Sequence, residues 1–79
     1  MKVYDVLLAG IEGKKGFFIS VEASATSKLK ASILALAEVK SRGMTGMKLE
    51  EVEIKARDGN VTKPIILRVY GKSYFPLDN

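Results

Sequence analysis

The stretch that decides the fold is SKLKASILALAEVKSR, residues 27–42 of a 79-residue chain. Its apolar residues recur in steps of three and four, the repeat of an α-helix that buries one side. We therefore expect a helix over Thr26–Arg42, started by a hydroxyl N-cap and ended by Gly43. The core-facing side of this helix is expected to carry Leu29, Ile33, Leu36, Ala37 and Val39, with Ala31 and Ala35 on the back.

On both sides of this stretch the apolar residues alternate in steps of two, which is typical of half-buried β-strands. Four strands are predicted, at Val3–Ala9, Phe17–Ala23, Leu49–Arg57 and Pro64–Lys72. The glycine-rich link over 10–16 predicts a hairpin between the first two strands. A turn at Glu12-Gly13 and a turn at Gly13-Lys14 both join their apolar sides, so both registers remain open. Asp58-Gly59-Asn60 predicts a second hairpin, between the third and fourth strands.

The predicted strand order rests on which strands are apolar on both faces, because such strands are typical of a sheet interior. The first and fourth strands have this property, whereas the third carries Val52, Ile54 and Ala56 on one face and charges on the other. The expected fold is α+β: a ββαββ chain forming one domain over residues 1–79, with a four-stranded mixed sheet in the order 2-1-4-3. The first and fourth strands are then parallel neighbours. One helix packs on one face, against Val6, Phe17, Ile19, Val52 and Leu67.

Two outer hairpins, a crossing helix and parallel central strands make this pattern similar to the β-grasp, or ubiquitin-like, superfold. The passage over 17–23, followed by a helix starting near Thr26, resembles the second strand and the helix of that fold. The resemblance implies a scaffold for protein or nucleic-acid binding. Ubiquitin-like modifiers and sulfur carriers end in a flexible diglycine, whereas this chain ends Phe75-Pro76-Leu77-Asp78-Asn79, so a conjugating role is not expected.

Composition argues against an enzyme. With no His and no Cys, the chain lacks the usual general base, the most easily activated nucleophile and the common transition-metal ligands. The acidic cluster Glu50, Glu51 and Glu53 is better interpreted as a solvated strand face than as a catalytic site. We expect no catalytic residue, cofactor or metal. The absence of a signal peptide, of a membrane-spanning run and of Cys favours a cytoplasmic protein.

The sheet face opposite the helix is the predicted interaction surface, because it combines apolar side chains with a few polar ones on a small chain. We expect a non-catalytic protein-interaction module that self-associates or binds a protein partner through this face. The alternative is that residues 74–77 fold back and cover it. The predicted contact residues are Val3, Leu7, Phe18, Ile66, Arg68, Tyr70 and Lys72.

A second hypothesis assigns the same face to RNA or single-stranded nucleic acid. The formal charge is +4, and two aromatic residues of this face could stack on bases beside cationic side chains. This hypothesis ranks second because the thirteen Lys and Arg residues are scattered and several carboxylates share the surface. Possible phosphate contacts are Lys14 and Lys15 in the hairpin loop, together with Lys55 and Arg57.

Overall fold

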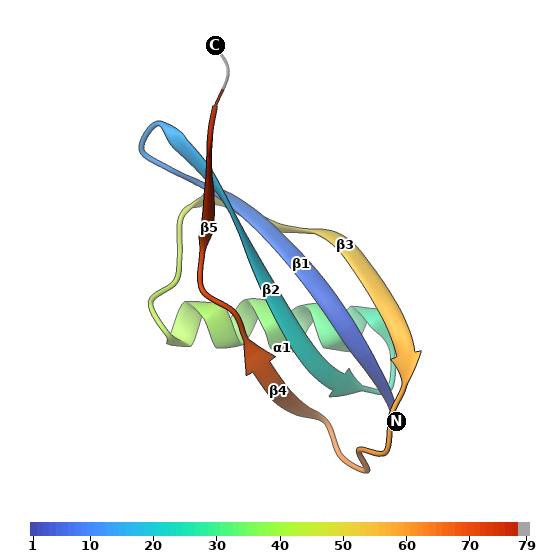
Figure 1. The fold of residues 1–79 in the computed structure, drawn as a ribbon. Coiled ribbons are helices and arrows are strands. Elements are labelled where there is room, and N and C mark those ends of the chain that lie inside the picture. The colour runs from blue at the N-terminus through green and yellow to red at the C-terminus, as the bar shows by residue number, and fades with distance from the viewer. Residues whose placement is uncertain (78–79) are drawn as a thin grey trace.

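The structure, a computed structural model, describes residues 1–77, so Asp78 and Asn79 of the C-terminal sequence lie outside the described residues. One helix packs on one face of an antiparallel sheet, as Figure 1 shows, which confirms the α+β class and the ββαββ element order. A fifth, short strand follows. The elements are β1 (Lys2–Glu12), β2 (Lys15–Ala25), α1 (Lys28–Ser41), β3 (Met47–Asp58), β4 (Ile65–Val69) and β5 (Ser73–Pro76).

The strands lie in the order β3-β1-β2-β4. β5 pairs with the first residues of β2, next to the hairpin turn, whereas β4 pairs with the later part of β2. The expected order 2-1-4-3 had placed the first strand beside the fourth in parallel, whereas β1 lies between β3 and β2, and all the strand pairs within residues 1–77 are antiparallel. The predicted hairpin between the third and fourth strands is also wrong. The parallel central pair that carried the β-grasp resemblance is therefore not found among the described strands.

The connection between β3 and β4 explains this difference. It runs across the ends of β1 and β2, from one edge of the sheet to the other (Figure 1). Contacts along its length hold it there: Gly59 lies against Val3, and the N-terminal ammonium donates a hydrogen bond to the Val61 carbonyl at 3.0 Å. A turn signal in the sequence shows where the chain reverses, but it does not show which strand the chain then joins.

The first hairpin follows the second of the two expected registers. Gly13 has a φ of 62° and the strands turn at Gly13-Lys14, which pairs Leu8 with Ile19 and Val6 with Val21. Farther out, the Phe17 ring lies over its cross-strand partner Gly10, where an added Cβ would come within 2.5 Å of the ring. Glycine at this position leaves room for the ring to fold back over the strand.

Shifts in strand register change which side chains reach the core. Between β1 and β3 the register shifts beside Val52, and between β2 and β4 it shifts beside Leu67. Because a one-residue shift exchanges the two faces, Val52 and Leu67 are exposed instead of packing under the helix. Ile66 packs against the core, so its predicted place on the opposite face is wrong.

The helix is rotated relative to the prediction. Ser27 is its N-cap, accepting a hydrogen bond from the Lys30 amide at 3.2 Å, and Arg42 is its C-cap. The buried side carries Ala31, Ala35 and Val39, whereas the predicted core residues Leu29 and Ile33 are exposed. Small side chains allow α1 to approach the sheet closely, and the large residues of the core come mainly from the strands: Tyr4, Leu8, Phe17 and Ile19.

Candidate interaction surfaces

The sheet face opposite α1 is polar over the half nearest the N-terminus. In this half Asp5 lies opposite Glu22 of β2 and Lys55 of β3. Leu7 lies opposite Ser20 of β2 and Glu53 of β3. Leu7 is half-buried, whereas Val3 is only 2% exposed because the Gly59 loop lies against it. The predicted continuous apolar patch is therefore not present on this half of the face.

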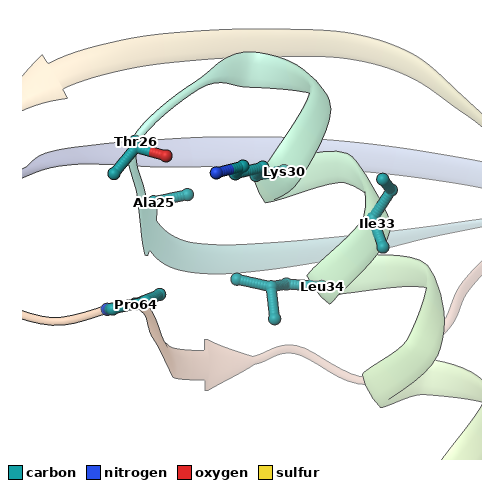
Figure 2. A pocket seen from close by; sticks show the side chains of 6 residues that line it. All are labelled: Ala25, Thr26, Lys30, Ile33, Leu34 and Pro64. Atoms are coloured by element: carbon teal, nitrogen blue, oxygen red, sulfur yellow. The ribbon is translucent and has the colours of Figure 1, made fainter.

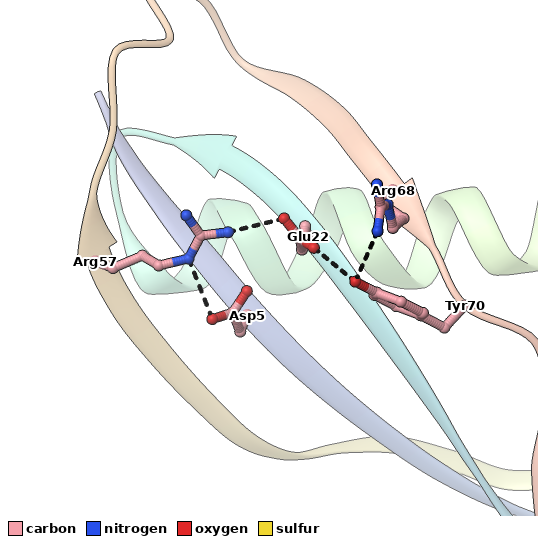
Figure 3. A network of polar contacts seen from close by, with 5 residues as sticks. All are labelled: Asp5, Glu22, Arg57, Arg68 and Tyr70. Atoms are coloured by element: carbon pink, nitrogen blue, oxygen red, sulfur yellow. Dashed lines mark hydrogen bonds and ion pairs between the residues drawn. The ribbon is translucent and has the colours of Figure 1, made fainter.

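The cations of this half are engaged by neighbouring side chains in a network drawn in Figure 3. The Arg57 guanidinium donates to the Glu22 carboxylate at 2.8 Å and to the Asp5 carboxylate at 3.4 Å. The Tyr70 hydroxyl donates to the other Glu22 oxygen at 2.9 Å and accepts from Arg68 at 3.3 Å. The hydrogen bond with Tyr70 raises the pKa of Arg68 above its ordinary value. Glu22 thus accepts a hydrogen bond from Tyr70, one of the predicted contact residues, and forms an ion pair with Arg57, one of the predicted phosphate contacts.

Lys72 lies at a different place from the one predicted. Its Nζ donates to Glu12 at 2.7 Å and to the Thr45 carbonyl at 3.0 Å, and it lies 4.3 Å from the centroid of the buried Phe17 ring. The Tyr74 hydroxyl donates to the second Glu12 oxygen at 2.8 Å. We call Glu12, Lys72 and Tyr74 the hairpin clasp, because they join the chain around β5 to the tip of the β1–β2 hairpin.

The hairpin clasp perturbs the acidity of its own members. The hydrogen bonds from Lys72 and Tyr74 lower the pKa of Glu12 below its ordinary value. The hydrogen bond to Glu12 raises the pKa of the Tyr74 phenol above its ordinary value. These shifts are those of a structural ion pair with a hydroxyl donor, and the members do not surround a pocket in which a substrate could be placed.

The other half of this sheet face, toward the hairpin tip, is apolar and is covered in part by the chain itself. The Phe75 ring stacks on Phe18, with ring centroids 4.8 Å apart. It also lies over Gly16, its cross-strand partner. At this end of the face the C-terminal segment therefore folds back onto the sheet, as the alternative prediction for residues 74–77 expected. Lys14 and Lys15 are exposed at the adjoining turn, with the Lys15 Nζ 5.9 Å from the Tyr74 ring centroid.

A second apolar surface, which the sequence prediction placed in the core, lies on the outward side of α1. Leu29 is 70% exposed and Ile33 is 57% exposed, and Ala37 continues the same side one turn later. Beside Ile33 a groove of about 270 Å³ opens between α1 and the start of β4. Figure 2 shows Leu34 projecting from α1 toward Pro64 across this groove; its lining residues are Ala25, Thr26, Lys30, Ile33, Leu34 and Pro64.

The signal that could have revealed this surface is present in the helix sequence. Ala31, Ala35 and Val39 repeat in steps of four just as Leu29, Ile33 and Ala37 do, so α1 has two apolar sides. The prediction assigned the side with the larger apolar residues to the core, because burying larger side chains is more favourable, and this assignment was wrong. We call the exposed set, Leu29, Ile33 and Ala37 with the adjoining groove, the α1 surface.

The described residues contain few features of a chemical site. Over residues 1–77 no three His, Cys, Asp or Glu side chains are grouped so that they could hold a metal ion, and every buried side-chain polar atom has a hydrogen-bond partner. None of the helices described is long and apolar enough to cross a membrane. No protein-family model, curated protein or solved structure matches the chain.

Proposed function

We propose that this chain is a non-catalytic protein-interaction module that self-associates through the α1 surface. The observation that carries the proposal is the exposure of Leu29 and Ile33, 70% and 57%, on one side of a well-capped helix. Burying two such side chains against a partner removes apolar area from water, which favours association by about 25 cal/mol for each Å² buried. The adjoining groove extends the same surface toward β4.

The α1 surface is a better candidate than the opposite sheet face for two reasons. On that face the Phe18 side chain is already stacked on Phe75, and the other half is occupied by the network around Glu22. Covering a charged network with a partner would remove it from water at a cost in free energy. No such network lies on the outward side of α1.

The charges beside the α1 surface predict how self-association depends on salt. Lys30 and Lys40 are exposed on the same outward side, and no carboxylate in residues 1–77 forms an ion pair with either. Two copies meeting through this surface bring like charges together. Since salt screens that repulsion and leaves the apolar contact in place, self-association is expected to be weak at low salt and stronger at high salt.

Sedimentation velocity across a wide dilution series, at low and at high salt, tests the proposal. The wild-type chain should show concentration-dependent association that increases with salt, and the double variant Leu29→Ser, Ile33→Ser should remain a monomer. Met47→Ser is the matched control, because Met47 is 65% exposed on β3, away from the α1 surface. A wild-type chain that stays monomeric at every concentration and salt would contradict self-association. So would association that the double variant retains.

Nucleic-acid binding is less well supported. Lys55, Arg57 and Lys72 each form an ion pair with a carboxylate, and Arg68 donates to Tyr70 beside Glu22. These contacts would have to be exchanged for phosphate contacts. Affinity for a mixed-sequence single strand would fall steeply with salt, the opposite of the trend expected for self-association.

A further inference from the structure

We infer that the α1 surface also docks an extended segment of another protein, rich in carboxylates and carrying an apolar residue, which adds as a strand to the open edge of β4. The inference rests on the proposed function only in that both use the outward side of α1. It names the partner chemistry and the geometry of binding: backbone pairing along β4, one apolar side chain in the groove, and carboxylates beside lysines.

The outer edge of β4 is open. Among the described strands, β4 pairs on one side with β2 and has no strand on its other side. Four of its five residues are apolar, and its one charged side chain, Arg68, is held against Tyr70. An apolar edge strand with free backbone groups is a template for a further strand.

The opposite edge of the sheet shows what a protected edge looks like in the same molecule. β3 is longer than β4 and places charges along most of its length, whereas β4 carries one charged residue. Both edge strands are bulged, so charge is what distinguishes them, and charged side chains discourage the addition of another strand. Addition is therefore expected at β4 and not at β3, whose charged residues are Lys48, Glu50, Glu51, Glu53, Lys55, Arg57 and Asp58.

The groove supplies a place for a side chain of the added strand. Alternate side chains of a strand beyond β4 point to the α1 side of the sheet, toward the groove between Leu34 and Pro64 (Figure 2). At about 270 Å³ the groove is smaller than the roughly 300–1,000 Å³ of sites for small organic ligands. It therefore fits one large apolar side chain better than a free small molecule.

The charge around the groove selects an acidic segment. Lys30 is the one charged residue in the lining, Lys28 lies two residues before it, and Lys63 directly precedes Pro64 of the lining. None of these lysines forms an ion pair within residues 1–77. A second copy adding through its own β4 would bring another Lys63 and Arg68 to this positive edge. Carboxylates on the added segment would instead complement it.

The test uses a short synthetic peptide, capped at both ends, with a central leucine and an aspartate two residues before and two residues after it, so that the leucine and both carboxylates lie on one face of the added strand. The peptide is titrated into the full chain, and the amide chemical shifts of the chain are followed. Two matched peptides separate the contribution of charge from that of backbone pairing. The first has lysine in place of aspartate. The second has N-methylated backbone amides, so that the edge of the peptide facing β4 cannot form strand hydrogen bonds. The acidic peptide should shift the amides of β4 and the first turns of α1, more weakly at high salt. The two control peptides should not bind there.

Variants of the chain give the second arm. Lys30→Glu should weaken binding of the acidic peptide by about fivefold, the scale of one exposed ion pair, whereas Lys40→Glu, farther along α1, should change it little. Shifts confined to other elements, or equal binding of the acidic and basic peptides, would overturn the inference. Binding at α1 and β4 that tolerates N-methylation would overturn strand addition alone. Self-association is measured separately and has the opposite salt dependence, so either proposal can fail without the other.

Discussion

At the scale of single residues, Ser24 holds the start of β4 to β2. It is fully buried, its Oγ accepts a hydrogen bond from the Ile65 amide at 3.1 Å, and it donates to the Lys63 carbonyl. In the sequence Ser24 is one of several hydroxyl residues before the helix, a pattern that predicts a helix N-cap and not a contact with β4. Its role depends on the crossing of the β3–β4 connection, a long-range contact that local sequence does not contain.

Replacing Ser24 by Ala should destabilise the fold by about 1–3 kcal/mol, because the Ile65 amide and the Lys63 carbonyl lose their buried partner. Ser20→Ala is the matched control: Ser20 lies on the same strand but is exposed, and its change should stay within about 0.5 kcal/mol. Urea unfolding of both variants measures the difference. Equal stability of the two variants would show that the Ser24 hydroxyl contributes nothing to attaching β4.

At the scale of elements, α1 shows how the size of a side chain decides which side of a helix is buried. Ala35 is fully buried against the sheet and Ala37 is exposed on the outward side. Ala35→Leu adds volume where the helix and sheet are in close contact and should cost about 1–3 kcal/mol or more. Ala37→Leu makes the same change on the outward side and should change stability by less than about 0.5 kcal/mol. Thermal or urea unfolding tests this, and a larger loss in Ala37→Leu would reverse the assigned sides of α1.

The hairpin clasp predicts a specific pH dependence. The pKa of Glu12 is lowered from its ordinary 4.5, so its contribution to stability is present above 4.5 and is lost as pH falls through the lower, folded-state pKa. The pKa of Tyr74 is raised from 10.0, so its contribution is present below 10.0 and is lost as pH rises through the higher, folded-state pKa.

Two variants separate these effects. Relative to the wild-type chain, Glu12→Gln should lose less stability on acidification below pH 4.5, and Tyr74→Phe should lose less above pH 10.0. The measurement is the urea midpoint as a function of pH. Parallel pH profiles for the wild-type chain and both variants would mean that the clasp does not couple proton binding to folding.

At the scale of the whole molecule, the elements were predictable because each depends on nearby residues. The periodicity of residues 27–42, the Gly13 turn and the alternation of the strands are all local. Strand order, the bulges at Val52 and Leu67, and the rotation of α1 depend on contacts between distant residues, and the sequence pattern fitted the wrong arrangement equally well. Because the predicted interaction face depended on these long-range features, Ile66 and Lys72 were misplaced and the burial of Val3 by the β3–β4 connection was missed, whereas Arg68 and Tyr70 lie on the predicted face.

The helix is also much shorter than the sheet that it covers, so the two ends of the molecule are not packed equally. The described chain is 43 Å long, whereas α1, with 14 residues, spans about 21 Å, and β1, with 11 residues, spans about 36 Å. The helix therefore covers only part of the β1–β2 hairpin. Toward the tip, β1 pairs with the start of β3 as far as Ile11. The rest of the tip is held by the short strand β5, by Phe75 on Phe18, and by the clasp.

This imbalance predicts that the molecule opens from the hairpin end. Amides over 11–16 and in β5 should exchange hydrogen through a low-energy local opening, whereas those around Val6 and Val21, fully paired and covered by α1, should exchange only on global unfolding. Phe75→Ala removes the ring that covers Gly16 and Phe18, so it should speed exchange at the tip and leave the Val6–Val21 region nearly unchanged. Native-state hydrogen exchange at increasing urea distinguishes the two classes of amide. If the tip and the centre exchanged with the same free energy and the same urea dependence, the sheet would be one cooperative unit and β5 would be as firmly held as the strands under the helix.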